Sequence, residues 1–195
     1  LVFGLGGGMI LGLLAGYLRG WVDFIISRVS EFIFSFPPII VGIVVAIAME
    51  PGRRSVIIAI SIVVLAASTR IIRSAVLQHR EMAYVEAAMV IGASPYRVMW
   101  RHILPNTAPL AIVLMSALLP TAILFESALT FLGFGLPPGE ASWGADLSSA
   151  RRFVTIAPWL AIYPGAALSL TILAFNLLGD SLRDVLDPRL RGTGL

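Results

Sequence analysis

The sequence alternates five long apolar stretches with segments that hold most of its charged residues. The stretches cover residues 1–18, 32–49, 55–72, 108–132 and 157–178. Each is long enough, or nearly so, to cross about 30 Å of hydrocarbon as a helix. A helix is also the one open-chain element that satisfies its own backbone hydrogen bonds there. The pattern predicts an all-α polytopic membrane protein with a single transmembrane domain over residues 1–195.

The composition agrees with a surface that faces lipid. Of the 195 residues, 58% are hydrophobic and 13% are charged, and the mean hydropathy is +0.92. A soluble domain carries roughly twice that fraction of charged residues. The chain opens with Leu1 inside an apolar run and without an initiator Met, so we expect further residues before it.

Arginine positions predict the orientation of the spans, because positive residues concentrate in cytoplasmic flanks. All 14 basic residues are Arg. Alternating spans place ten of them on one side: Arg19, Arg28, Arg70, Arg73, Arg80, Arg97, Arg101, Arg183, Arg189 and Arg191. The other four are Arg53, Arg54, Arg151 and Arg152. We therefore expect the C-terminus and the segment 73–107 to be cytoplasmic, and the segment 133–156 to be external.

Missing residue types exclude several kinds of chemistry. The sequence has no Lys and no Cys, which excludes a GxxxxGK[ST] phosphate-binding loop, a Schiff-base lysine and a thiol nucleophile. The two histidines, His79 and His102, both fall in the polar segment 73–107. We expect no catalytic residue and no metal site. The net charge of +3 is dispersed along the spans, so a nucleic-acid partner is not expected.

The first half of the segment 73–107 predicts a short helix that ends in a sharp corner. Good helix formers run from Glu81 to Ile91, and Gly92 stands where a left-handed cap is needed. Met82, Val85 and Met89 form an apolar strip on this helix.

The second half predicts another short helix. Ser94 is a suitable N-cap, and Pro95 occupies the first helical position. This helix continues to about Ile103, and we expect Pro105 to end it. On this helix, Tyr96, Met99, Trp100 and Ile103 cluster at helical spacing. Such a pair of helices suits docking into a partner's groove, lying on the anionic inner leaflet, or packing on its own bundle.

The exact residues here resemble the EAA loop of ABC-importer permeases. That motif reads EAA, three residues, Gly, nine residues, Ile, any residue, Leu, Pro, and Glu86-Ala87-Ala88, Gly92 and Leu104-Pro105 match it in register. The departure is His102 at the Ile position, with Ile103 beside it. The resemblance implies a type I ABC-importer-like helical bundle whose loop couples to a cytoplasmic ATPase.

The implied coupling residues have distinct roles. Glu86 would be the polar anchor in a cleft of the ATPase, Ala87 and Ala88 the positions of close approach, and Gly92 the corner. The coupling set is completed by Ser94, Pro95, Leu104 and Pro105. The implied partners are two ABC ATPase subunits, a second homologous permease, an extracytoplasmic solute-binding protein and membrane lipid. ATP would be used by the ATPases, with no cofactor bound by this chain.

The resemblance extends along nearly the whole chain to the second, C-type permease of the dipeptide, oligopeptide and nickel branch. The matching segments are Phe36-Pro37-Pro38, Glu126 to Gly135, Pro137-Pro138, Ser142-Trp143-Gly144, Ala157-Pro158-Trp159, Asn176 to Asp184 and Asp187-Pro188-Arg189. Members of that branch carry one further span before the point where Leu1 falls, so the first span is expected to be missing. The resemblance places the protein in the bacterial inner membrane.

Three features within the spans allow two interpretations each. Glu126 is either a pathway or gating residue, or a hydrogen-bonded carboxylate that holds helices together. Asn176 favours a hydrogen bond between helices over a pathway role. The glycines of residues 1–18 favour close helix packing, with the partner permease as one candidate surface.

The expected function is that of a transmembrane permease subunit of an ATP-driven importer for di- or oligopeptides or nickel. The first alternative is an EAA-type ABC permease for another solute. The second is a secondary transporter, which would need ion ligands or charged relays inside the membrane. Beyond Glu126 the spans offer few such groups.

Overall fold

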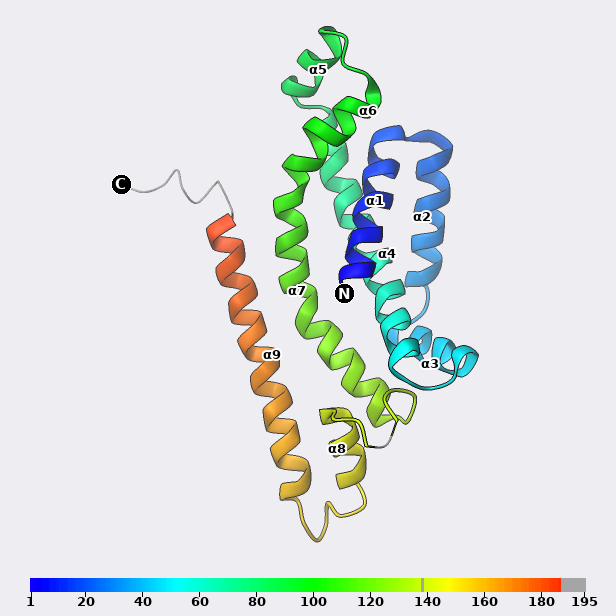
Figure 1. The fold of residues 1–195 in the computed structure, drawn as a ribbon, viewed down its shortest axis with the longest axis vertical. Coiled ribbons are helices and arrows are strands. Elements are labelled where there is room, and N and C mark those ends of the chain that lie inside the picture. The colour runs from blue at the N-terminus through cyan, green and yellow to red at the C-terminus, as the bar shows by residue number, and fades with distance from the viewer. Residues whose placement is uncertain (138, 187–195) are drawn as a thin grey trace, which may run out of the picture. The chain divides into compact units, whose positions relative to one another are not determined.

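The computed structural model describes residues 1–137 and 139–186, and every regular element in them is helical. Pro138 and the tail residues Asp187, Pro188, Arg189 and Arg191 lie outside the described residues. In chain order the helices are α1 (Val2–Leu18), α2 (Gly20–Phe34), α3 (Pro38–Met49), α4 (Arg53–Arg80), α5 (Ala83–Val90), α6 (Pro95–Arg97), the π-helix η1 (Val98–Ile103), α7 (Leu104–Phe131), α8 (Trp143–Ala150) and α9 (Trp159–Leu186) (Figure 1). The all-α fold class is confirmed.

Several helices are long enough to cross a membrane. Within the described residues, three helical runs meet the length and hydropathy that a span needs: Arg53–Arg80, Pro95–Phe131 and Trp159–Leu182. A fourth crossing results if α2 and α3 form one span, although they are bent by 92° at the break between them. The apolar α1 is shorter, with 17 residues.

The apolar stretch 32–49 is not one straight helix. It contains the end of α2 and all of α3, and the chain turns sharply between Phe34 and Pro38. Pro37 precedes α3 in an extended conformation, with ψ at 136°. Proline lacks an N–H and disfavours a helical conformation in the residue before it, so Phe36-Pro37-Pro38 interrupts the helix.

Two other helices extend past the apolar stretches that predict them. α4 continues beyond residue 72 to Arg80, and α7 begins at Leu104 instead of residue 108. Hydropathy marks the part of a helix that suits lipid, whereas the backbone hydrogen bonds continue into polar sequence. As a result, much of the polar segment 73–107 is helix.

The chain divides into two compact units. The first unit comprises Val2–Ser35 and Ile62–Met115, and so contains α1, α2, α5, α6, η1 and the adjoining parts of α4 and α7. The second unit includes Phe36–Ser61 and the chain from Ser116 onward, with α3, α8, α9 and the remaining parts of α4 and α7.

Close packing of α1 on α4 organises the first unit. A Cβ atom added to Gly8 would lie 1.9 Å from Ser68 Oγ, one on Gly12 would lie 2.8 Å from Ile72 Cβ, and one on Gly16 would lie 2.8 Å from the Cβ of Val76. Glycines at this four-residue spacing allow two helix backbones to approach closely. The face with these three glycines therefore packs within the chain, which corrects the suggestion that it contacts a partner permease.

In the second unit, α8 follows α7 in the chain and packs on α9. Ser142 caps α8, because its Oγ accepts a hydrogen bond from Gly144 N–H at 3.1 Å. Gly144 is pressed against α7, where an added Cβ would lie 2.2 Å from the carbonyl oxygen of Ser127. The segment 133–156, which we expect to be external, thus contains a helix that packs on the end of α7.

Candidate functional site

The corner between the two short helices forms as the sequence predicts. α5 ends in a left-handed residue, Gly92, with φ at +84°. Ala93 N–H donates to the Ala88 carbonyl and Gly92 N–H donates to the Met89 carbonyl, both at 3.0 Å. This pair of bonds is the Schellman motif, which satisfies the last carbonyls of a helix. The corner at Gly92 is confirmed.

The start of the second helix also follows the prediction. Ser94 Oγ accepts a hydrogen bond from Arg97 N–H at 3.4 Å, and Pro95 occupies the first turn. The helix does not end at Pro105, however. It passes through η1 into α7, and one helical run extends from Pro95 to Phe131.

The prediction that Pro105 ends the helix is wrong because the chain changes its hydrogen-bond pattern just before the proline. Leu104 N–H donates to the carbonyl of Met99, five residues earlier, which is a π-helical bond. Pro105 then occupies the first turn of α7, where its missing N–H costs little.

The coupling residues predicted from the EAA resemblance differ in their exposure. Glu86, Ala87, Gly92, Ser94, Pro95 and Pro105 are exposed, whereas Leu104 is half-buried. Ala88 is 5% exposed, because α5 packs on η1 along this side. The small side chain of Ala88 therefore allows close approach within the chain, and its expected role at a partner stays a prediction.

The tip of the loop exposes a group of large apolar side chains. Its members are Met82, Met89, Val90, Ile91, Tyr96 and Trp100. Val90 and Ile91, next to the Gly92 corner, are 81% and 85% exposed. In contrast, Val85, Met99 and Ile103 point inward and are buried. One side of the loop is therefore buried by packing within the chain. The apolar tip stays exposed, as expected of an interaction surface.

Polar contacts hold the base of the loop to the ends of α1 and α4. Arg19 donates to Glu81 at 2.8 Å, and the Arg80 guanidinium lies over the Tyr17 ring, 5.5 Å from its centre. Tyr84 Oη lies 3.0 Å from His79 Nδ1. Burial raises the pKa of the Tyr84 phenol above its ordinary value, so the phenol remains protonated.

An ion pair joins α2 to α4 in the same unit. Arg73 Nε donates to Asp23 Oδ1 at 2.5 Å, and an Arg73 Nη donates to Asp23 Oδ2 at 2.6 Å. The Arg73 and Asp23 side chains are 34% and 19% exposed. Paired bonds of this kind fix the geometry of both groups. The sequence places Arg73 in the expected cytoplasmic flank and does not identify Asp23 as its partner. The available signal was a carboxylate, Asp23, close to an apolar stretch.

Glu126 is the centre of a hydrogen-bond network in the second unit. Its Oε1 accepts from Thr130 Oγ1 at 2.8 Å and from Ser142 Oγ at 2.9 Å. Its Oε2 accepts from Ser127 Oγ at 3.3 Å. Thr130 Oγ1 accepts in turn from Leu136 N–H at 3.1 Å. The carboxylate therefore connects α7 to the next turn and to the cap of α8, which favours the structural interpretation of this residue.

Replacing Glu126 with alanine is expected to loosen the segment 133–156. The change removes the shared acceptor of three hydroxyl groups, and one charge-assisted hydrogen bond contributes about 2 kcal/mol. Limited proteolysis of the purified protein should show cleavage in this segment at least roughly tenfold faster. Asp146→Ala is the matched control, since this exposed carboxylate on α8 forms no hydrogen bond with the described residues. Unchanged cleavage in Glu126→Ala would contradict the structural role.

Asn176 does not form the expected bond within this chain. It lies on α9 with an exposed side chain and makes no hydrogen bond to the described residues. Within residues 1–137 and 139–186, no group of three His, Asp or Glu side chains is placed to hold a metal ion.

Comparison with known proteins places these features in a family. Residues 8–192 match the family model described as "Binding-protein-dependent transport system inner membrane component". The chain is 42% identical over 184 residues to glutathione transport system permease protein GsiD of Pectobacterium atrosepticum, covering 94% of this chain and 61% of the relative. It is 42% identical over 176 residues to GsiD of Escherichia coli O157:H7, covering 90% and 58%.

A third relative, from Brucella suis, is provisionally named a peptide transport system permease protein. The identity is 41% over 187 residues, which cover 96% of this chain and 63% of the relative. The chain thus spans about three fifths of the length of these relatives.

Proposed function

Because the chain belongs to the family of binding-protein-dependent transport system inner membrane components, we propose that it is the membrane-spanning permease of an ATP-driven importer of peptides or peptide-like solutes. Relatives are named for glutathione and peptide transport, which supports this substrate class over nickel. The protein crosses the bacterial inner membrane several times, with the loop between α4 and α7 on the cytoplasmic side.

The observation that supports this function best is the exposed apolar tip at the end of a continuous helix. Val90 and Ile91 are largely exposed beside the Gly92 corner, where the partner ATPase would bind. The helical run from Pro95 to Phe131 then leads from the loop into the membrane domain without a break. Movement of the ATPase at this tip is transmitted along this helical run, which changes access to the pathway from one side to the other.

The proposed complex contains two ATPase subunits, a second permease and an extracytoplasmic solute-binding protein. ATP is hydrolysed by the ATPases, and this chain binds no cofactor and changes no covalent bond. Exposed Asn176 on α9 is available for a contact with the second permease. A secondary transporter is disfavoured, because Glu126 is occupied by three hydroxyl donors and does not stand free as an ion ligand.

Cysteine crosslinking tests the docking of the loop, since the native sequence contains no Cys. Ala87→Cys, paired with a cysteine in the groove of the ATPase subunit, should crosslink in a manner that responds to ATP. Ala88→Cys is the matched control, because Ala88 is the next residue of the same type and is 5% exposed. Its crosslinking should be much weaker. If no exposed position of the tip crosslinks while the complex still transports, the proposed coupling is wrong.

A further inference from the structure

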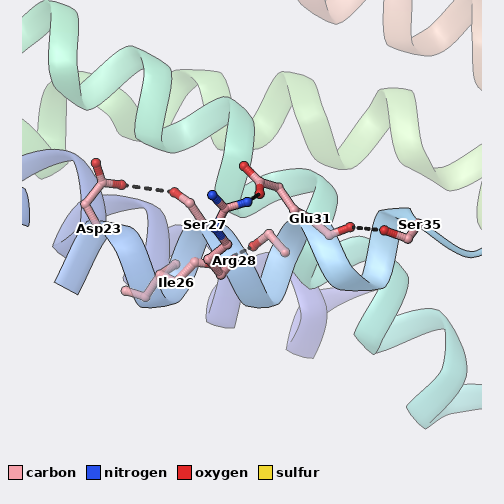
Figure 2. A network of polar contacts seen from close by, with 7 residues as sticks. Asp23, Ile26, Ser27, Arg28, Glu31 and Ser35 are labelled. Carbon is pink, nitrogen blue, oxygen red and sulfur yellow. Dashed lines mark hydrogen bonds and ion pairs between the residues drawn. The ribbon is translucent and has the colours of Figure 1, made fainter. Parts of the chain in front are cut away.

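A stripe of polar side chains runs along α2, which is otherwise strongly apolar. Asp23, Ser27, Ser30 and Glu31 lie on one face, since residues three and four positions apart are neighbours on a helix. Figure 2 shows this stripe, with Ser27 bonded to Asp23 and Arg28 paired with Glu31. Polar groups at membrane depth are costly against lipid, so such a stripe faces water or protein.

The stripe forms one wall of a cavity in the first unit, and α4 forms the other. The cavity has a volume of about 460 Å³. Its polar lining residues are Ser27, Ser30, Glu31, Ser35, Thr69, Arg70 and Arg73. The volume falls within the range of about 300–1,000 Å³ that is typical of sites for small molecules. A lining of hydroxyl and charged groups suits a hydrated solute.

Most polar groups of the cavity already have partners. Arg73 is paired with Asp23, and Glu31 with Arg28. The Ser30 and Thr69 hydroxyls donate to backbone carbonyls of their own helices. Arg70 is exposed and forms no ion pair or hydrogen bond with the described residues. The charged side chain left available to a ligand in this cavity is therefore a cation.

We propose that this cavity is a transient binding site for the solute on its way through the permease, and that Arg70 binds the solute's carboxylate. A guanidinium matches a carboxylate with two parallel hydrogen bonds. Every linear peptide with a free C-terminus carries this group whatever its sequence, so a single arginine provides recognition without side-chain selectivity. A free cation at this point disfavours a metal cation such as Ni²⁺. The inference rests on the proposed function.

Uptake by the complete importer in proteoliposomes tests the role of Arg70. With a free-acid dipeptide below saturation, Arg70→Gln should lower ATP-dependent uptake about tenfold or more, the effect of losing a charge-assisted hydrogen bond. Arg70→Lys should retain only part of the uptake, because the positive charge stays and the two parallel hydrogen bonds are lost. Arg54→Gln is the matched control, since Arg54 is an exposed arginine near the other end of α4. Uptake at the wild-type rate in Arg70→Gln would overturn the proposal while leaving the permease function intact. Failure of the wild-type complex to transport any peptide would instead refute the proposed function.

A second measurement covers the case in which Arg70→Gln does not assemble. Ser35 lines the same cavity, is exposed and donates to a backbone carbonyl of its own helix, so Ser35→Cys introduces a reactive thiol with little disturbance. In the Ser35→Cys complex in zwitterionic lipid, the free-acid dipeptide should slow labelling by an anionic thiol reagent, and its C-terminal amide should not. Equal protection by both peptides, or by neither, would overturn the role of the carboxylate. Protection by added anionic lipid alone would assign the site to a lipid headgroup and overturn it as well.

Discussion

Replacing Gly12 with leucine is expected to prevent α1 from packing on α4 and to reduce the yield of folded protein severely. A Cβ at this position would lie 2.8 Å from the Thr69 carbonyl oxygen and 3.0 Å from the Arg73 amide nitrogen. These are backbone atoms, which cannot rotate away, so the helices must separate. Overpacking of this kind costs about 3 kcal/mol or more, whereas the gain in helix propensity from Gly to Leu is only about 0.8 kcal/mol. Thermal unfolding of the purified protein measures the difference.

The same helix offers a matched control for this effect. Gly6 also lies on α1, and a Cβ there would meet nothing within 4 Å. Gly6→Leu should therefore fold and unfold close to the wild-type temperature. If Gly12→Leu and Gly6→Leu proved equally stable, the close packing of α1 on α4 would be wrong. If both variants were destabilised equally, the loss would come from replacing a glycine within α1 and not from the contact with α4.

Asp23→Ala is the second change with a large expected effect. It removes the partner of Arg73, whose guanidinium then remains partly buried between α2 and α4 without its two short bonds. Breaking a fully buried pair costs about 3–5 kcal/mol, and the partial exposure of both side chains lowers the expected loss to about 2 kcal/mol. The midpoint of thermal unfolding should fall accordingly. A double-mutant cycle with Arg73→Ala should show strong coupling between the two sites.

An exposed pair on the same helix separates the ion pair from a general charge effect. Arg28 and Glu31 are bonded at 2.8 Å, with side chains 67% and 62% exposed. Exposed pairs of this type contribute about 0.5 kcal/mol or less. Arg28→Ala should therefore change the unfolding temperature little. Additive effects of Asp23→Ala and Arg73→Ala would show that the two groups do not stabilise each other.

Local rules explain why the corner between α5 and α6 was predictable. Gly92, Ser94 and Pro95 interact with backbone groups within five residues, and such contacts follow from residue type and spacing. The same rules failed at Pro105, because they assume regular α-helical bonding. The π-helical bond between Leu104 and Met99 allows the helix to continue through Pro105. Local propensity does not indicate this bond.

The division of roles between Ala87 and Ala88 shows where sequence reasoning reached its limit. The motif treats the two alanines alike, yet Ala87 is exposed and Ala88 is buried against η1. Successive residues on a helix point in directions about 100° apart, so one of two neighbours can face the chain while the other faces a partner. Which one does so depends on where η1 lies.

By itself, the sequence determined the all-α membrane class, the apolar stretches, the corner at Gly92 and the family, because these depend on composition and on contacts between near neighbours. Tertiary structure decided which helix packs on the glycine face of α1, which arginine pairs with Asp23, and which residue of the segment 133–156 binds Glu126. The partners in the last two cases lie 50 and 16 residues apart. Such contacts form only when particular helix faces meet, and the pattern along one helix does not specify the neighbour that covers it.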